Sequence, residues 1–410
     1  MLKHTLNKFF ATSVLSVSLF YNAFGGGFQM NMQSLKATSM GGAFTGFASD
    51  ASTAFYNPGA MTFREYSQIA LGATFNINST SYLSPYTGNF NTDNKLQVPI
   101  HFYGIGKIND QTAFGISVNT PFNLHTTWED NWTGRYIARE THLKATYLQP
   151  AISYQFSDKF GLGGGPVIAF GKTYMTRAIP YNSSAGEIGM ELDGHSLGFG
   201  FNIGLFLQTS DEFSLGLDYR SAVKMNVNDG DANFSNVPSS MTGTYPASTK
   251  FETEYTLPSV ISLGAAYKLT RELTLCMDVN YTTWNSFDTL EFKFENNSQL
   301  NFGIGKYYSN VFAVRIGAQY ELSDRIDVRG GVAFDGSPVS DEYVSPDNPD
   351  NDRYIFSLGG SMKFGENFSV DIAYMLQNIK EREVKNEQYN FSGNYKSLIN
   401  IFGVTFNYQF

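Results

Sequence analysis

The sequence is poor in cysteine, tryptophan and charge for a chain of 410 residues. Its single cysteine, Cys276, excludes an internal disulfide framework and any metal site built from cysteines. Charged residues make up only 16% of the chain, whereas roughly a quarter is usual in globular proteins. The net charge of −9 argues against a nucleic-acid partner, because binding phosphates requires basic patches.

Long apolar runs are also missing after the first 25 residues, where no stretch reaches the roughly 20 residues of a membrane-spanning helix. Aromatic residues are instead abundant, with 36 Phe and 25 Tyr. In the C-terminal "IFGVTFNYQF", large apolar residues occupy one parity and small or polar residues the other. This period-two alternation indicates strands whose two faces meet different environments. It recurs in segments 197–207, 273–282, 312–320 and 368–376.

The connectors between these segments alternate between short and long. The short polar turns are expected at 107–111, 157–159, 210–212, 270–272, 323–325 and 365–367. The longer polar stretches are expected near 80–94, 125–137, 179–191, 226–249, 286–305, 336–352 and 380–394. Short connections on one rim and long ones on the other are typical of outer-membrane barrels, which have an even number of strands. The pattern predicts an all-β fold, a 14-stranded antiparallel transmembrane β-barrel with its apolar residues facing lipid.

The N-terminus has the features of a signal peptide over residues 1–25. Lys3 and Lys8 precede a short apolar run, and a small-x-small pattern ends at Gly25. The alternative, a buried N-terminal helix, is disfavoured by the three consecutive glycines that end the run. We therefore expect the mature chain to leave the cytoplasm.

Residues 26–66 differ from the rest of the chain, because they are rich in Gly, Ala, Ser and Thr and lack sustained alternation. They form either a disordered tail or a plug inside the barrel. Disordered tails usually carry more charge and fewer apolar groups, so the composition favours a plug with short helical turns. The predicted domains are thus a signal peptide (1–25), an N-terminal hatch (26–66) and a barrel (67–410).

Three stretches carry a resemblance to a known family. These are "GGFQMN" at 26–31, "ATSMGGAFTGFASDASTAFYNPGAM" at 37–61, and "WTGRY" at 132–136 followed by "YLQPAISYQF". The chain resembles the FadL/TodX family of outer-membrane transporters for long-chain fatty acids and other hydrophobic compounds. The Asn57-Pro58-Gly59 motif is fairly specific, although the family more often has alanine at its third position. Beyond residue 156 the resemblance is one of pattern rather than motif.

The resemblance implies a 14-stranded barrel in the bacterial outer membrane, closed by an N-terminal hatch. It also implies passive transport by loop capture, lumenal binding and lateral release. By the same resemblance Phe28, with Met30, is a candidate for the ligand site, and plain hatch packing is the alternative. Residues 57–59 are expected to hold the shape of the hatch. Trp132, Arg135 and Tyr136 either shape a capture surface or belong to an aromatic girdle at the membrane interface.

Two further groups of residues are singled out by their chemistry. Pro121 cannot donate a ladder hydrogen bond and marks either a gap in the barrel wall or an ordinary strand end. Arg220, Arg315 and Arg329 have lumen-facing parity and suit an anionic head group, since arginine binds carboxylates bidentately. Aspartates share this parity, so a network of salt bridges that pins the hatch is the alternative.

Other functions receive little support from the sequence. The chain has five histidines and no Gly-x-Ser-x-Gly pattern, so we expect no enzyme activity. His125 is placed in a loop and no histidine pair has metal-ligand spacing, so neither a metal site nor a cofactor is expected. An open diffusion porin or an adhesin-like barrel is the remaining alternative, which an apolar plug disfavours.

The expected partners follow from a barrel embedded in the outer membrane. They are membrane lipid and lipopolysaccharide, a hydrophobic ligand, and the barrel assembly machinery. A last strand that ends in an aromatic residue, here Phe410, resembles the signal by which this machinery recognises outer-membrane barrels. A monomer is expected. The sequence leaves the cargo open among fatty acids, aromatic hydrocarbons and haem.

Overall fold

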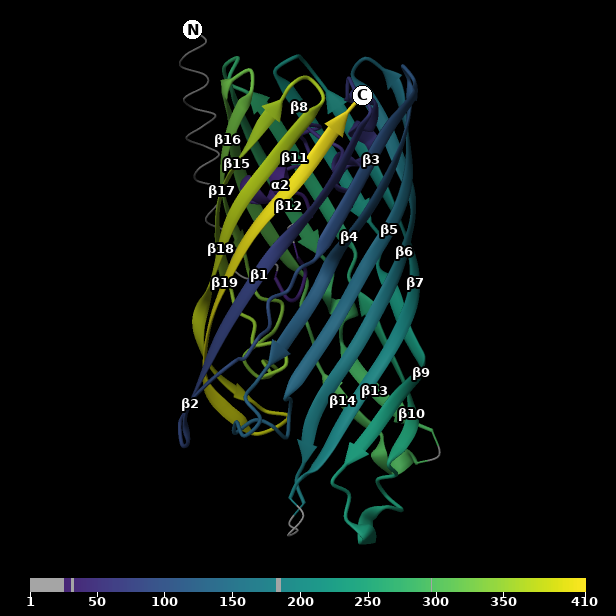
Figure 1. Ribbon diagram of the computed structural model, residues 1–410, viewed down its shortest axis with the longest axis vertical. Helices are drawn as coiled ribbons and strands as arrows, with labels where there is room; N and C mark the ends of the chain where they lie inside the picture. The colour runs from purple at the N-terminus through teal and green to yellow at the C-terminus, as the bar shows by residue number, and fades with distance from the viewer. Residues whose placement is uncertain (1–25, 31–32, 182–185, 296) are drawn as a thin grey trace.

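The computed structural model describes residues 26–30, 33–181, 186–295 and 297–410 as a tall, tilted barrel of strands (Figure 1). The expected signal peptide, residues 1–25, lies outside the described residues. The strands are β1 (Gln68–Ser84), β2 (Gly88–Asn91), β3 (Ile100–Asn109), β4 (Thr112–Thr127), β5 (Glu140–Ser157), β6 (Phe160–Ile179), β7 (Ile188–Gln208), β8 (Phe213–Arg220), β9 (Val223–Ser235), β10 (Ser248–Leu257), β11 (Val260–Lys268), β12 (Leu273–Thr282), β13 (Thr289–Phe294), β14 (Phe302–Gly305), β15 (Val311–Ser323), β16 (Ile326–Asp335), β17 (Arg353–Phe364), β18 (Phe368–Asn386) and β19 (Phe391–Gln409).

These strands form a closed antiparallel ring of fourteen, as the sequence predicts. Consecutive neighbours pair around the wall, and β1 pairs with β19 to close it. Four strands of the ring are interrupted, and each consists of two consecutive segments. These pairs of segments are β8 and β9, β10 and β11, β12 and β13, and β14 and β15. Strand β2 folds back on the end of β1. Among the described residues, no helix has both the length and the apolar character needed to cross a membrane.

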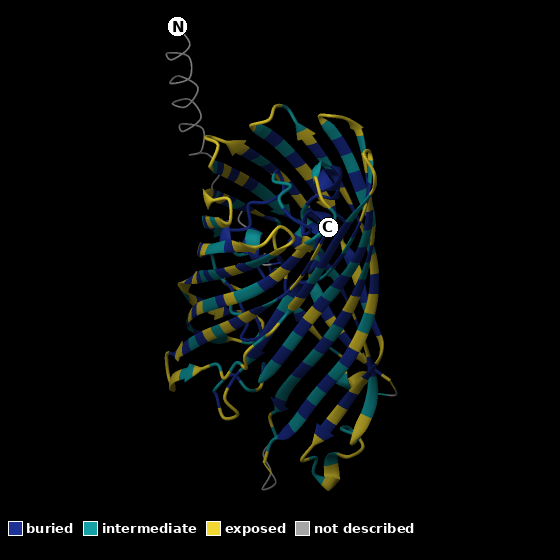
Figure 2. Cartoon of the chain, turned by 45° about the horizontal axis from the view of Figure 1, so that its top comes forward, coloured by how far each residue is buried: buried dark blue, intermediate teal, exposed yellow. Residues whose placement is uncertain are grey.

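The outer face of the wall is apolar, and its inner face is small or polar. On β19, Phe402 and Phe406 are 47% and 49% exposed, whereas Thr405 and Asn407 between and beside them are buried. The same alternation appears as stripes along the strands in Figure 2. Closure of the ring satisfies the backbone hydrogen bonds of the wall, which is what allows such strands to face lipid.

The two rims differ as expected, but the strands are longer on the loop side than the sequence suggested. The expected long loop at 380–394 is wrong, because β18 and β19 run through it and meet in a tight hairpin. Glu381, Glu383 and Lys385 point outward there and are exposed, while Val384 is buried. Charged residues on the outer face suit water rather than lipid, so strand pairing continues beyond the apolar belt. Strands also extend into the expected loops at 226–249 and 286–305.

Residues 26–66 form short helical turns, namely α2 (Leu35–Ser39), α3 (Thr53–Tyr56) and the 3₁₀ helix η2 (Pro58–Phe63). Helix α2 packs on β16, β17 and β18, while η2 packs on β5, β6 and β7. These strand groups lie on opposite sides of the ring, so the segment crosses the barrel interior, where Figure 1 shows it in purple. Three further 3₁₀ helices, η3 (Ser239–Met241), η4 (Trp284–Ser286) and η5 (Ser298–Leu300), lie between strands on the loop side.

Candidate ligand site

The N-terminal segment pairs with β4 along a stretch where β4 has lost its neighbour β3. The β3–β4 ladder ends at the pair of Phe102 with Val118. Farther along β4, the Met30 N–H donates to the carbonyl oxygen of Pro121 at 2.8 Å, and the Asn123 N–H donates to Phe28 at 3.1 Å. Residues 28–30 therefore cover an edge of β4 that would otherwise be unpaired.

A β-bulge in β4 lies at Pro121. The β4–β5 register shifts between Asn119 and Phe122, so two residues of β4 face one residue of β5. Such a bulge shifts the parity of the strand. Before it Asn119 is buried on the inner face, and after it Phe122 and Leu124 belong to the buried aromatic core. The bulge thus turns Phe122 toward Phe28.

A cavity, called here the Phe28 cavity, lies between the N-terminal segment and the wall. Strands β1, β4, β18 and β19 contribute to its lining, together with residues 348–350. The Phe28 ring centroid lies 4.9 Å from that of Trp284, 5.2 Å from Phe287 and 6.0 Å from Phe122. Its apolar lining is Phe28, Met30, Leu124, Ile379 and Ile399.

A second cavity, called here the arginine cavity, shares Met30 with the first. It brings together four of the residues singled out from the sequence, since Met30, Pro121, Arg220 and Arg315 all line it. Arg329 lies apart from both cavities. Its guanidinium donates to Gln319, Asp327 and Ser361 at 2.7, 3.1 and 2.7 Å.

The arginines of the arginine cavity hold the N-terminal segment. Arg220 Nη2 donates to the carbonyl oxygen of Phe55 at 2.6 Å, and its guanidinium lies 3.8 Å from the centre of the Phe55 ring. Arg315 Nη1 donates to the carbonyl oxygen of Gly41 at 3.1 Å, while Nη2 lies 2.7 Å from Asp335. Both guanidinium groups therefore already have partners within the chain, as a network that pins the segment requires.

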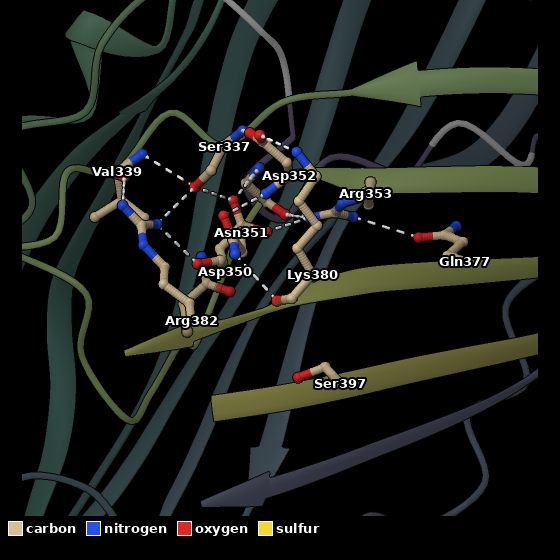
Figure 3. Close-up of polar contacts among 12 residues, drawn as sticks. Ser337, Val339, Asp350, Asn351, Asp352, Arg353, Gln377, Lys380, Arg382 and Ser397 are labelled. Carbon is tan, nitrogen blue, oxygen red and sulfur yellow. Dashed lines mark hydrogen bonds and ion pairs between the residues drawn. The ribbon is translucent and has the colours of Figure 1, made fainter. Parts of the chain in front are cut away.

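An arginine that the sequence reasoning missed, Arg353, lines the Phe28 cavity. Its Nη2 contacts Asp350 and donates to the carbonyl oxygen of Gly27 at 2.8 Å. Figure 3 shows Asp350 and Arg353 between Arg382 on one side and Gln377 on the other. Asp350 also accepts from the Gly27 N–H at 3.0 Å. The signal for Arg353 was its inward parity at the start of β17, which it shares with buried Ile355.

The Asn57-Pro58-Gly59 motif fixes the segment against β6 and β7. Asn57 Nδ2 donates to the carbonyl oxygens of Thr45 at 3.0 Å and Leu205 at 2.9 Å, and its Oδ1 accepts from the Gly59 N–H at 3.1 Å. A Cβ atom at Gly59 would lie 2.4 Å from the carbonyl oxygen of Gly204. Glycine at the third position of the motif therefore suits the close approach of these two backbones.

The three candidate capture residues lie in different environments. Trp132 is fully buried, with its ring centroid 4.3 Å from that of Trp128, so it belongs to the inner aromatic core and not to an outer girdle. Arg135 Nη2 lies 2.7 Å from Glu187, which also accepts from Tyr136. The hydrogen bond from Arg135 has the largest effect on Glu187, and together with the one from Tyr136 it lowers the pKa of this carboxyl group to about 2. Tyr136 is 36% exposed at the edge of this cluster.

Two statements about the histidines are corrected by the structure. His125 lies within β4 and not in a loop. It faces His142 directly across the β4–β5 ladder, so the chain does contain a histidine pair that the spacing along the sequence concealed. The register of the hairpin, displaced by the bulge, is what brings the two together.

Comparison with known proteins agrees with this architecture. Residues 16–410 match the family described as outer membrane protein transport protein (OMPP1/FadL/TodX). The long-chain fatty acid transport protein of Salmonella typhi is 26% identical, over 98% of this chain and 99% of the relative. Outer membrane protein P1 of Haemophilus influenzae is 25% identical, over 98% and 100%.

Solved structures share the fold. A FadL homologue of Pseudomonas aeruginosa superposes with a TM-score of 0.84 at 24% identity, covering 94% of this chain and 100% of that one. The toluene transporter TodX of Pseudomonas putida superposes with a TM-score of 0.71 at 14% identity, covering 95% and 98%. The matched family consists of transport proteins and not of enzymes. With its apolar-walled ring of strands and a family match over nearly its whole length, the chain belongs to the OMPP1/FadL/TodX family of outer-membrane transport proteins.

Proposed function

We propose that the protein is a passive channel for hydrophobic compounds, with long-chain fatty acids as the preferred class. The observation that carries this proposal is the Phe28 cavity, in which a group of large apolar side chains lies among polar residues and beside two cations, Lys95 and Arg353. Arg353 Nε is buried and has no hydrogen-bond partner among the described residues. Small-molecule sites combine apolar side chains, which bury the ligand, with polar groups that fix its orientation. A fatty acid fits this chemistry through its alkyl chain and its carboxylate.

Cargo enters from the loop side through the aromatic core. Trp128, Trp132 and Tyr82 lie together there, with the Tyr82 and Trp132 ring centroids 5.9 Å apart. Aromatic side chains offer large apolar surfaces, and the indole N–H groups of Trp128 and Trp132 donate to backbone carbonyl oxygens at 2.9 and 2.8 Å. A hydrophobic molecule captured by the loops can therefore leave water before it reaches the Phe28 cavity.

Cargo leaves sideways between β3 and β4, beside the bulge at Pro121. Beyond Val118 the two strands no longer pair, and the edge of β4 is covered by Phe28–Met30 and not by a wall strand. Among the described residues, displacing this stretch from β4 breaks the backbone hydrogen bonds that join Met30 to Pro121 and Phe28 to Asn123. The N-terminal segment then serves as the hatch, and its release from β4 opens the way into the bilayer.

A reversible disulfide tests this route. Gln29 and Phe122 face each other in an isolated antiparallel bridge, which is a spacing that a disulfide can span. In a Cys276→Ala background, we replace both with cysteine and measure uptake of a fluorescent long-chain fatty acid. We expect uptake to stop in the oxidised protein and to return after reduction. The reduced form of the same protein controls for loss of the Phe122 ring.

A cysteine pair at Ala73 and Val404, which face each other in the regular β1–β19 ladder, is the matched control. Oxidation of this pair should leave uptake unchanged. If the oxidised Gln29–Phe122 pair transports as fast as its reduced form, lateral release at this site is wrong. If small hydrophilic solutes pass both forms equally well, the protein is an open porin and not a channel for hydrophobic cargo.

A further inference from the structure

Two histidines and a glutamate form a cluster on the outer side of the β4–β5 ladder. His125 of β4 faces His142 of β5, with their ring centroids 3.8 Å apart. Glu140 lies two residues before His142, and so on the same face of β5. Its Oε1 atom lies 2.9 Å from His142 Nε2 and 3.9 Å from His125 Nε2. One nitrogen or oxygen atom from each residue lies within 4.8 Å of the others.

Two imidazole nitrogens and one carboxylate oxygen are a donor set that borderline divalent ions such as Zn²⁺ prefer. Zinc binds such atoms at about 2.0–2.2 Å, which places tetrahedral ligands roughly 3.5 Å apart. The three donors need only small side-chain rotations to reach this spacing. They come from two adjacent strands of a rigid wall, so little backbone movement is required.

The chain by itself leaves this cluster poorly satisfied. His125 is only 8% exposed. Its Nε2 lies at hydrogen-bond distance, 3.1 Å, from Thr127 Oγ1, whereas its Nδ1 has no hydrogen-bond partner among the described residues. His142 Nε2 lies close to Glu140 but not in the geometry of a hydrogen bond. The two imidazole rings meet edge to face, with 63° between their planes, so they do not stack on each other. A bound cation would satisfy the lone pairs that the protein leaves without donors.

The position of the cluster gives it a structural consequence. His125 follows the bulge of β4 and lines the Phe28 cavity, in the part of β4 that lacks β3 as a neighbour. Two lysines are close enough to act electrostatically on the histidines. Lys95 lines the same cavity, and Lys172 on β6 is paired with Asp193 at 3.5 Å. We propose that His125, Glu140 and His142 bind one Zn²⁺ ion, which ties β4 to β5 at this free stretch. Three protein ligands leave the fourth position to water.

Zinc titration of the full mature chain in detergent tests the proposal, using protein without a histidine tag and previously treated with EDTA. We expect calorimetry to report one equivalent of Zn²⁺. Co²⁺ in place of Zn²⁺ should give the visible absorption of a tetrahedral site. His142→Ala and Glu140→Gln should each weaken binding by at least about tenfold, since loss of an outer-shell partner alone costs that much.

His195→Ala is the matched control, because His195 is an exposed histidine of β7 outside the cluster. It should bind Zn²⁺ as the parent chain does. Glu140→Gln preserves the shape of the side chain, so it remains informative if His142→Ala fails to fold. The proposal is overturned if the parent chain binds no Zn²⁺, or if both cluster variants bind it unchanged, as expected for a simple histidine–glutamate ion pair. Zinc binding is measured without cargo, so this result is independent of the proposed transport.

Discussion

The half of the barrel lumen near the short turns and the half near the long loops hold different side chains. In the turn half, buried charged groups bond to the backbone of the N-terminal segment. Asp278, for example, accepts from the N–H groups of Phe44 and Thr45, both at 2.9 Å. In the loop half lies the large aromatic core, which contains all three tryptophans of the chain, Trp128, Trp132 and Trp284.

This difference follows from what each half must accommodate. An irregular segment inside a barrel has backbone N–H and C=O groups that need partners, and carboxylate and guanidinium groups supply them. A hydrophobic cargo needs the opposite, a surface that loses water without leaving polar atoms unsatisfied. The turn half therefore holds the segment in place. In the loop half Arg353 and Asp350 still bind the backbone of Gly27, and the aromatic core beside them is suited to receive an apolar molecule.

The largest effect should come from forcing the segment away from the wall in the turn half. A Cβ atom at Gly163 of β6 would lie 2.4 Å from the carbonyl oxygen of Pro58. Gly163→Val should displace η2, and the conductance of the protein in planar bilayers should rise sharply. Gly106 of β3 has open space around the equivalent atom, so Gly106→Val should conduct like the parent chain. Equal, low conductance of both variants would show that the segment does not close the lumen.

A smaller effect is expected when one charged group that holds the segment is removed. Arg315→Ala removes the buried ion pair with Asp335 at 2.7 Å and the hydrogen bond to Gly41. Breaking a buried ion pair costs about 3–5 kcal/mol, so the free energy of unfolding in urea should fall by that order. Arg325→Ala, at an exposed turn position, should change it little. Similar losses in both variants would contradict a role for Arg315 in holding the segment.

The sequence predicted those features of the barrel that depend on period-two alternation. Strand number and the lipid-facing residues follow from local pattern, since each strand shows it independently. The bulge at Pro121 was harder to place, because one inserted residue reverses the parity of everything after it. Contacts such as that of Arg353 with Gly27 join residues far apart in the chain, and no local signal reports them. The pairing of Phe28–Met30 with β4 was beyond prediction for the same reason.

The smallest and most specific effect is expected when a phenylalanine is replaced by alanine once in each half and the two variants are compared in stability and ligand binding. Phe28 in the loop half and Phe44 in the turn half are both buried, and each packs against other aromatic rings. Because Phe28→Ala and Phe44→Ala remove the same apolar group, both should destabilise the protein to a similar degree. Only Phe28→Ala removes a wall of the proposed binding cavity, so only this variant should weaken binding of a fluorescent fatty acid, by about tenfold or ~1.4 kcal/mol. If the two variants lose affinity equally, the loss reflects general loosening of the segment, and the cavity at Phe28 is not where the cargo binds.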